Sequence, residues 1–116
     1  MLLRIDSASP LPIFEQLATQ VRQAVIAGEV ASGERLPSAC DLAESLDVNQ
    51  HTVLHAYQLL RDEGLIELRR GRGAIVTDRA ADYAGLSGAI AAVVEEARKL
   101  EVPPATLTAL IREAYQ

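Results

Sequence analysis

The sequence of 116 residues predicts a mainly helical protein with one small β-hairpin. Three observations lead to this class. Apolar residues recur at helical spacing in the first half of the chain, two short apolar runs flank the basic stretch RRGRG, and two more helical stripes follow. A chain of this length can form one compact domain of about 80 residues, with a tail too short for a second independent core.

The first expected helix covers residues 11–27. Apolar residues from Ile13 to Val21 recur at helical spacing after Pro12, which suits the first turn of a helix. Gly28 follows, where the end of a helix favours a positive backbone angle. The next residues, EVASGERLP, carry glycine and proline and are expected to form a loop.

Two short helices separated by a tight turn come next. Ser38 suits the cap of the first, because its hydroxyl can accept hydrogen bonds from free backbone N–H groups, and this helix is expected to stop near Asp47. Asn49 suits the cap of the second, expected over residues 50–63 and ended by Gly64. The intervening turn of three residues is typical of a helix-turn-helix, whose second helix lies in the major groove of DNA.

The expected hairpin lies around the basic stretch RRGRG. Ile66 and Leu68 precede it and residues 74–76 follow it, as two short strands would. Glycines let the backbone turn tightly beside a phosphate chain, and arginines add positive charge that can enter a narrow minor groove. A hairpin after a helix-turn-helix is a wing, so the sequence predicts a winged helix-turn-helix DNA-binding domain over residues 1–78.

Residues 79–116 are expected to form a two-helix dimerisation region. Their apolar side chains make one helical stripe before Pro103 and Pro104 and another after them. Two such helices cannot bury their stripes on one another alone, so we expect a homodimer in which a partner subunit covers them. The alternative is a tail that packs back on its own DNA-binding domain. The residues assigned to dimerisation are Leu86, Ile90, Val93, Val94, Ala97, Leu107, Leu110 and Ile111.

Three blocks of the sequence resemble the DNA-binding domain of the GntR family of bacterial transcription regulators. They are PIFEQLATQVRQAVIAGEVASGERLPS, LAESLDVNQHTV and AYQLLRDEGLIELRRGRGAIV, and they cover about residues 10–77. VNQHTVLHAYQLL and the short tail are most similar to the YtrA-like subfamily, whose members dimerise through two C-terminal helices. The resemblance implies a regulator, by default a repressor, that binds an inverted-repeat operator in double-stranded DNA as a homodimer.

The resemblance, checked against side-chain chemistry, assigns ten residues to DNA. Short polar side chains at the start of the second helix of the motif suit base edges and phosphates, and the Gln50 amide can contact adenine at two points. Ser38 is similar to a phosphate-contacting position, although simple capping explains it equally well. The alternative for the arginines is a solvated hairpin tip. The ten are Ser38, Asn49, Gln50, His51, Thr52, His55, Arg69, Arg70, Arg72 and Gly73.

The net charge of the chain argues against DNA binding, whereas the charge of one segment argues for it. The net charge is −5, whereas a basic domain is the simpler footprint of nucleic-acid binding. Residues 68–79, however, carry four arginines against Asp78 alone. Many GntR-like sequences have arginine at the position of Cys40 and, outside the YtrA-like group, also at the positions of Gln50 and Leu54. This chain lacks those charges for neutralising phosphates, so binding is expected to depend on the wing. A winged helix that binds another protein is the rival interpretation.

Other classes of function find little support. An enzyme built on Cys40 with a histidine base has no room for a substrate cleft, and two histidines four residues apart make half a metal site without a further ligand. We therefore expect no enzyme, metal or cofactor. Cys40 near a helix N-terminus suggests a redox switch as a hypothesis. Without a membrane span or signal peptide, a cytoplasmic protein with no membrane partner is expected. The sequence identifies no small-molecule effector.

Overall fold

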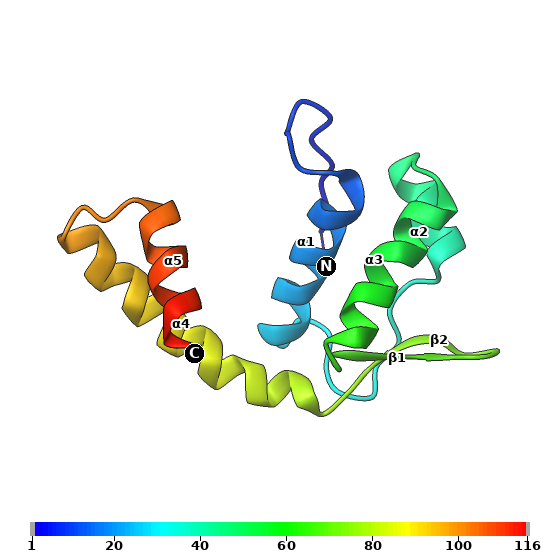
Figure 1. Ribbon diagram of the computed structural model, residues 1–116. Coiled ribbons are helices and arrows are strands. Elements are labelled where there is room, and N and C mark those ends of the chain that lie inside the picture. Colours follow the sequence, from blue (N-terminus) through cyan, green and yellow to red (C-terminus); the bar gives the residue numbers. More distant parts are fainter. Residues whose placement is uncertain (1, 116) are drawn as a thin grey trace. The chain divides into compact units, whose positions relative to one another are not determined.

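The computed structural model describes residues 2–115, and the described part contains five helices and one antiparallel sheet of two strands (Figure 1). By contacts the chain divides into two units, Met1–Ala84 and Gly85–Gln116. This order of helices and strands confirms the predicted class, mainly helical with a winged helix-turn-helix. The elements are α1 (Ile13–Ile26), α2 (Ala39–Leu46), α3 (Gln50–Asp62), β1 (Ile66–Arg69), β2 (Gly73–Val76), α4 (Arg79–Lys99) and α5 (Pro104–Ala114).

The helices of the first unit end where the local chemistry predicts. Gly28 after α1 and Gly64 after α3 have φ angles of 84° and 82°, as expected for glycine in this position. The residue after each glycine donates its N–H to a carbonyl five residues back, at 3.0 and 3.1 Å. Asp47 has the same role after α2 with a φ of 55°, in the left-handed region that aspartate enters more readily than most residues. Residues 47–49 thus make the predicted three-residue turn between α2 and α3.

The core of the first unit lies between the three helices and the inner face of the hairpin. α3 packs against both α1 and α2, and it also contacts β1. Its buried face has Val53, Ala56 and Leu60 at 0% exposure. Burial of apolar surface contributes about 25 cal/mol per Å², so this packing is the main source of stability. The largest fully buried side chains are Leu17, Leu36, Leu60, Leu65, Ile66, Val21, Val53 and Val76.

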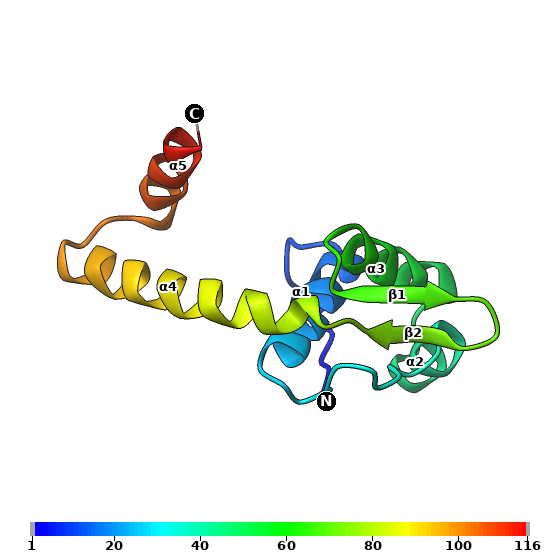
Figure 2. The same ribbon diagram turned by 90° about the horizontal axis from the view of Figure 1, so that it is seen from below.

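The sheet gains a short third edge from the segment before α2. β1 and β2 pair from Ile66 opposite Val76 to Arg69 opposite Gly73 (Figure 2). Beyond β2, the Leu36 N–H donates to the Ala74 carbonyl at 2.8 Å, and the Val76 N–H donates to the Glu34 carbonyl at 3.0 Å. The sequence predicts only a loop here. Strand pairing was not expected because Leu36 alone in this segment is apolar and buried, which leaves no alternating pattern to detect.

Tyr57 connects α3 to the same segment. Its side chain is 2% exposed, and its hydroxyl donates a hydrogen bond to the Pro37 carbonyl at 2.6 Å. Burial raises the pKa of Tyr57, because the charged phenolate is poorly solvated in the interior. The hydroxyl therefore stays protonated and holds the start of α2 against α3.

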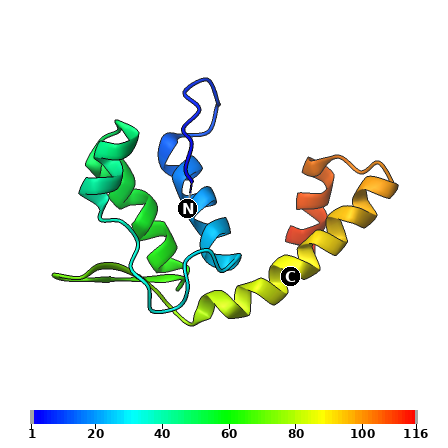
Figure 3. The same cartoon turned by 180° about the vertical axis from the view of Figure 1, so that it is seen from behind.

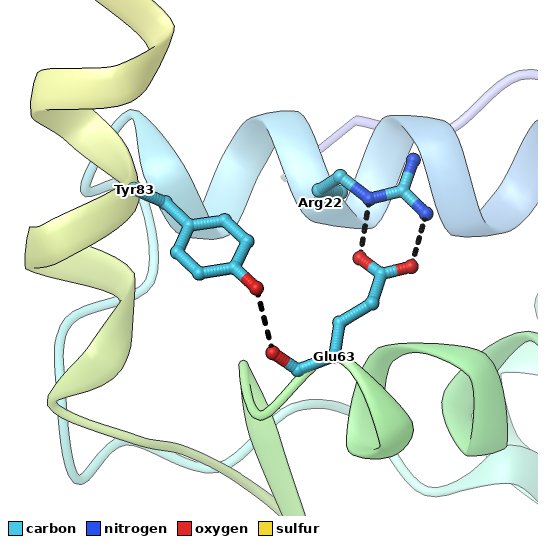
Figure 4. Close-up of polar contacts among 3 residues, drawn as sticks. All are labelled: Arg22, Glu63 and Tyr83. Carbon is cyan, nitrogen blue, oxygen red and sulfur yellow. Dashed lines mark hydrogen bonds and ion pairs between the residues drawn. The ribbon is translucent and has the colours of Figure 1, made fainter. Parts of the chain in front are cut away.

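A polar cluster joins the ends of α1 and α3 to the beginning of α4 (Figure 4). Arg22 donates two hydrogen bonds to the Glu63 carboxylate, both at 2.7 Å, and this bonding raises the pKa of Arg22 while burial acts in the opposite direction. The Tyr83 hydroxyl donates to the Glu63 carbonyl at 2.8 Å. Arg79 lies over the Tyr83 ring, 5.8 Å from its centroid. The first turns of α4 are thus fixed within the first unit.

The second unit contains the rest of α4 and all of α5, and much of its apolar surface is exposed. Among the residues assigned to dimerisation, Ala97 is buried, Val94 and Leu107 are half-buried, and the other five are exposed. Pro103 and Pro104 begin α5, as the sequence predicts. The exposed large apolar residues of this unit are Leu86, Ile90, Val93, Leu100, Leu110, Ile111 and Tyr115.

Replacing Tyr57 by phenylalanine tests the buried connection between α3 and the segment before α2. We expect Tyr57→Phe to lower the free energy of unfolding by about 1–2 kcal/mol, because the Pro37 carbonyl loses its partner. Tyr83→Phe is the matched control and should lose less, since Tyr83 is only half-buried. Urea unfolding at one fixed protein concentration measures both. A Tyr57→Phe variant as stable as the unmodified chain would contradict this assignment.

Candidate nucleic-acid interface

The first turn of α3 presents polar side chains at the surface. The Asn49 side-chain oxygen accepts a hydrogen bond from the His51 N–H at 2.8 Å, so Asn49 caps the helix as predicted. Gln50 and His51 are exposed, and Thr52 is half-buried. The side chains available to contact a ligand from this turn are therefore those of Gln50 and His51, with Asn49 restricted by its role in the cap.

His55 lies one turn further along α3 and is oriented by a contact from α1. Its ring stacks on that of Phe14, with 4.0 Å between ring centroids and 15° between ring planes. His55 remains exposed on its other side. The sequence did not identify Phe14 as part of the site, because an aromatic residue in the first turn of an amphipathic helix is indistinguishable from a core residue.

Ser38 caps α2 at another edge of the same region. Its hydroxyl oxygen accepts a hydrogen bond from the Asp41 N–H at 3.0 Å. This hydrogen bond supports the interpretation of Ser38 as a helix cap. The start of a helix also carries a partial positive charge, so the position remains suited to a phosphate. Cys40, in the first turn of α2, is exposed.

The turn of the hairpin is closed by the backbone and by glycine. The Arg72 N–H donates to the Arg69 carbonyl at 3.0 Å, and Gly71 and Gly73 have φ angles of 81° and 76°. A side chain at either position would be strained, which explains the glycines of RRGRG. The turn projects beyond α2 and α3 (Figures 1 and 3). The predicted wing is therefore an extended basic tip.

The three arginines of the wing differ in how their charge is used. Arg69 forms an ion pair with Glu67 at 2.7 Å. Within residues 2–115, Arg70 and Arg72 have no salt-bridge partner. The uncompensated positive charge of the wing thus belongs to Arg70 and Arg72, and these are the arginines best placed to attract an anion.

A groove of about 290 Å³ brings the start of α2, the middle of α3 and the hairpin together. Four of the predicted residues line it, namely Ser38, Arg69, Arg70 and Gly73. The other six are not among its lining: Asn49, which caps α3, residues 50–52 and His55 of α3, and Arg72 in the hairpin turn. Leu54 does line the groove. In the sequence this position stood out only because many GntR-like proteins have an arginine there. The full lining is Ser38, Ala39, Leu54, Tyr57, Leu68, Arg69, Arg70, Gly73 and Ala74.

Residues 2–115 contain no group of three or more histidine, cysteine, aspartate or glutamate side chains arranged to hold a metal ion. None of the helices described there has the length and apolar character that crossing a membrane requires.

Comparison with protein families matches the chain to the family described as "Bacterial regulatory proteins, gntR family". The match covers residues 13–76. This range begins at the first residue of α1 and ends at the last residue of β2. The matched segment is thus the whole winged helix-turn-helix.

Individual relatives agree with the family match. The HTH-type transcriptional repressor YtrA of Bacillus subtilis is 38% identical over 79 residues, which are 68% of this chain and 61% of YtrA. The HTH-type transcriptional regulator Rv1152 of Mycobacterium tuberculosis is 37% identical over 98 residues, 84% of this chain and 81% of that protein. The solved structure of YtrA from Sulfolobus acidocaldarius, a GntR-family transcription factor, is 35% identical to this chain and has a TM-score of 0.62. The likeness covers 78% of this chain and 99% of that chain. The chain spans less than two thirds of the length of Bacillus subtilis YtrA.

Two substitutions of Ser38 separate capping from phosphate contact. Ser38→Ala should lower the free energy of unfolding by about 1 kcal/mol, because the Asp41 N–H loses its acceptor. Ser38→Asp keeps a cap and should leave stability nearly unchanged, while its negative charge weakens binding to a DNA duplex at least tenfold if a phosphate lies here. Urea unfolding and fluorescence anisotropy measure the two effects. If both variants bind DNA equally well, Ser38 caps the helix and does not contact a phosphate.

Proposed function

This chain belongs to the GntR family of bacterial regulatory proteins, and we propose that it binds a specific inverted-repeat operator as a homodimer and represses transcription there. The observation that carries the proposal is the groove that places the start of α2, α3 and the basic hairpin side by side. These are the parts that a winged helix-turn-helix applies to DNA. Repression is proposed because YtrA of Bacillus subtilis, 38% identical over 79 residues, is named a repressor.

In the proposed complex α3 enters the major groove and the wing reaches the adjacent minor groove. Gln50 and His51 are exposed at the start of α3 and are the proposed base-reading residues. Arg61 is the only arginine of α3, which contains no lysine, and it lies in the last turn and pairs with Asp62 at 3.2 Å. Arg70 and Arg72 are therefore the proposed phosphate contacts of the wing, and they should contribute much of the salt dependence of binding.

The proposed dimer is supported by the exposed apolar side chains of the second unit. Leu86, Ile90 and Val93 are 56%, 48% and 43% exposed on α4, and Leu110 and Ile111 are 53% and 44% exposed on α5. Covering such surface stabilises an assembly by about 25 cal/mol per Å² of apolar area. A second copy of the chain offers an identical stripe, and a two-fold dimer pairs like with like. Two-fold symmetry in turn requires an operator whose half-sites are inverted repeats.

Selection from a random DNA library, followed by a salt titration, tests the proposal. We expect the full chain to enrich an inverted repeat whose binding weakens steeply as salt rises. An Arg70→Ala, Arg72→Ala double variant should bind at least tenfold more weakly at low salt. Its slope of log affinity against log salt should be about 3.6 units shallower, because the dimer loses four phosphate contacts and each contact removes about 0.9.

The control for this titration is an Arg4→Ala, Arg61→Ala double variant, which loses the same formal charge away from the wing. Its slope should match that of the unmodified chain. Absence of any enriched sequence at low salt would contradict DNA recognition and favour the protein-binding interpretation. Equal slopes for both double variants would mean that the wing has no special part.

A pair of aspartate substitutions on α4 tests the dimer. Ile90→Asp places a charge in the apolar stripe and should shift the chain from dimer to monomer at micromolar concentration. Ala92→Asp adds the same charge at an exposed position on the opposite side of the helix and should leave the dimer intact. Size-exclusion chromatography with light scattering gives the mass of each. An unmodified chain that elutes as a monomer would contradict the dimer.

A further inference from the structure

We propose that the groove between α3 and the wing binds one deoxyribose of the operator backbone, and that Leu54 discriminates there against a ribose 2′-hydroxyl. The inference rests on the proposed function and extends it from base reading to recognition of the sugar. It concerns nine lining residues, of which Leu54, Ala39 and Ala74 supply aliphatic surface and Arg70 supplies positive charge.

The position of the groove determines which part of DNA passes over it. α3 occupies the major groove and the wing occupies the neighbouring minor groove in the proposed complex. One sugar-phosphate strand separates these two grooves of a duplex, so it must cross between α3 and the hairpin. The groove lined by Leu54 of α3 and Gly73 of the hairpin lies between these two elements. The occupant is therefore backbone rather than a base.

The chemistry of the floor favours an apolar occupant. Leu54 is half-buried and lies beside Ala39 and Ala74, so the lining is mainly carbon. Of the two uncharged polar side chains, the Tyr57 hydroxyl donates to the Pro37 carbonyl, and the Ser38 oxygen accepts from the Asp41 N–H at the edge of the lining. A deoxyribose presents C–H groups to such a floor. A 2′-hydroxyl placed against Leu54, Ala39 and Ala74 would instead lose hydrogen bonds to water that these carbon atoms do not replace.

The rim supplies the complementary charge for the phosphates that flank the sugar. Arg70 lines the groove, is exposed, and has no salt-bridge partner within residues 2–115. Arg69 lines it too, but its guanidinium is paired with Glu67. An apolar floor beside an uncompensated arginine matches the alternation of sugar and phosphate along a strand. Leu54 then contributes a packing contact with the sugar, and the position needs no positive charge.

Single-sugar substitution in the selected operator tests this inference. Each nucleotide of one strand is replaced in turn by its ribonucleotide or by its 2′-fluoro analogue, which shares the sugar pucker of RNA but has no hydroxyl. We expect one position per half-site where the ribonucleotide weakens binding of the full chain about tenfold and the 2′-fluoro analogue does not. Leu54→Ala should bind unmodified DNA several-fold more weakly and lose this discrimination, because the enlarged groove admits water.

Leu59→Ala is the matched control, since Leu59 is also half-buried on α3 but does not line the groove. It should keep the discrimination even where it lowers stability. A series with no such position, or a Leu54→Ala variant that retains the full penalty, would overturn the sugar contact while operator binding stands. Loss of affinity on replacing one thymine by deoxyuridine, with a flat sugar series, would assign the groove to a thymine methyl instead. Failure to bind any DNA would overturn the proposed function as well.

Discussion

Burial of one face of α3 is the constraint on which the rest of the structure depends. Val53, Ala56 and Leu60 are fully buried where α3 packs against α1, α2 and the hairpin. Rotating α3 about its axis would expose them to water, so the orientation of the helix is fixed. His51 and His55 are thereby fixed at the surface on the opposite face, and Gln50 is exposed at the start of the helix. The same packing holds β1 beside α3, which positions the wing. Recognition helix and wing are thus parts of a single packed unit.

Local chemistry made much of this fold predictable. Caps such as Ser38 and Asn49, and glycines such as Gly28 and Gly64, act on their immediate neighbours, so their effect can be inferred from short stretches of sequence. Contacts between distant segments could not be inferred in this way. The pairing of residues 34–36 with β2, the stack of Phe14 on His55 and the groove beside Leu54 all depend on tertiary packing that no local pattern encodes.

The distribution of ion pairs explains how an acidic chain can present a basic site. Its net charge is −5, yet Arg22, Arg61 and Arg69 are each paired with a neighbouring carboxylate. Arg70 and Arg72, without a salt bridge in the described residues 2–115, stand on a tip that projects from the helices. Local field rather than net charge governs approach to DNA. The wing of the proposed regulator therefore offers a local attraction for phosphate, and Gln50 and His51 at the start of α3 are left to read bases.

Hydroxyl-radical footprinting of the full chain on its selected operator tests the central claim most directly, because it maps backbone contacts on both strands. A two-fold dimer with a wing should give two patches of protection related by symmetry and separated by about 10 base pairs or a multiple of this. Each patch should include a minor-groove segment beside a major-groove segment. A single unsymmetrical patch, or uniform cleavage at saturating protein, would contradict the account of a dimeric winged helix-turn-helix regulator.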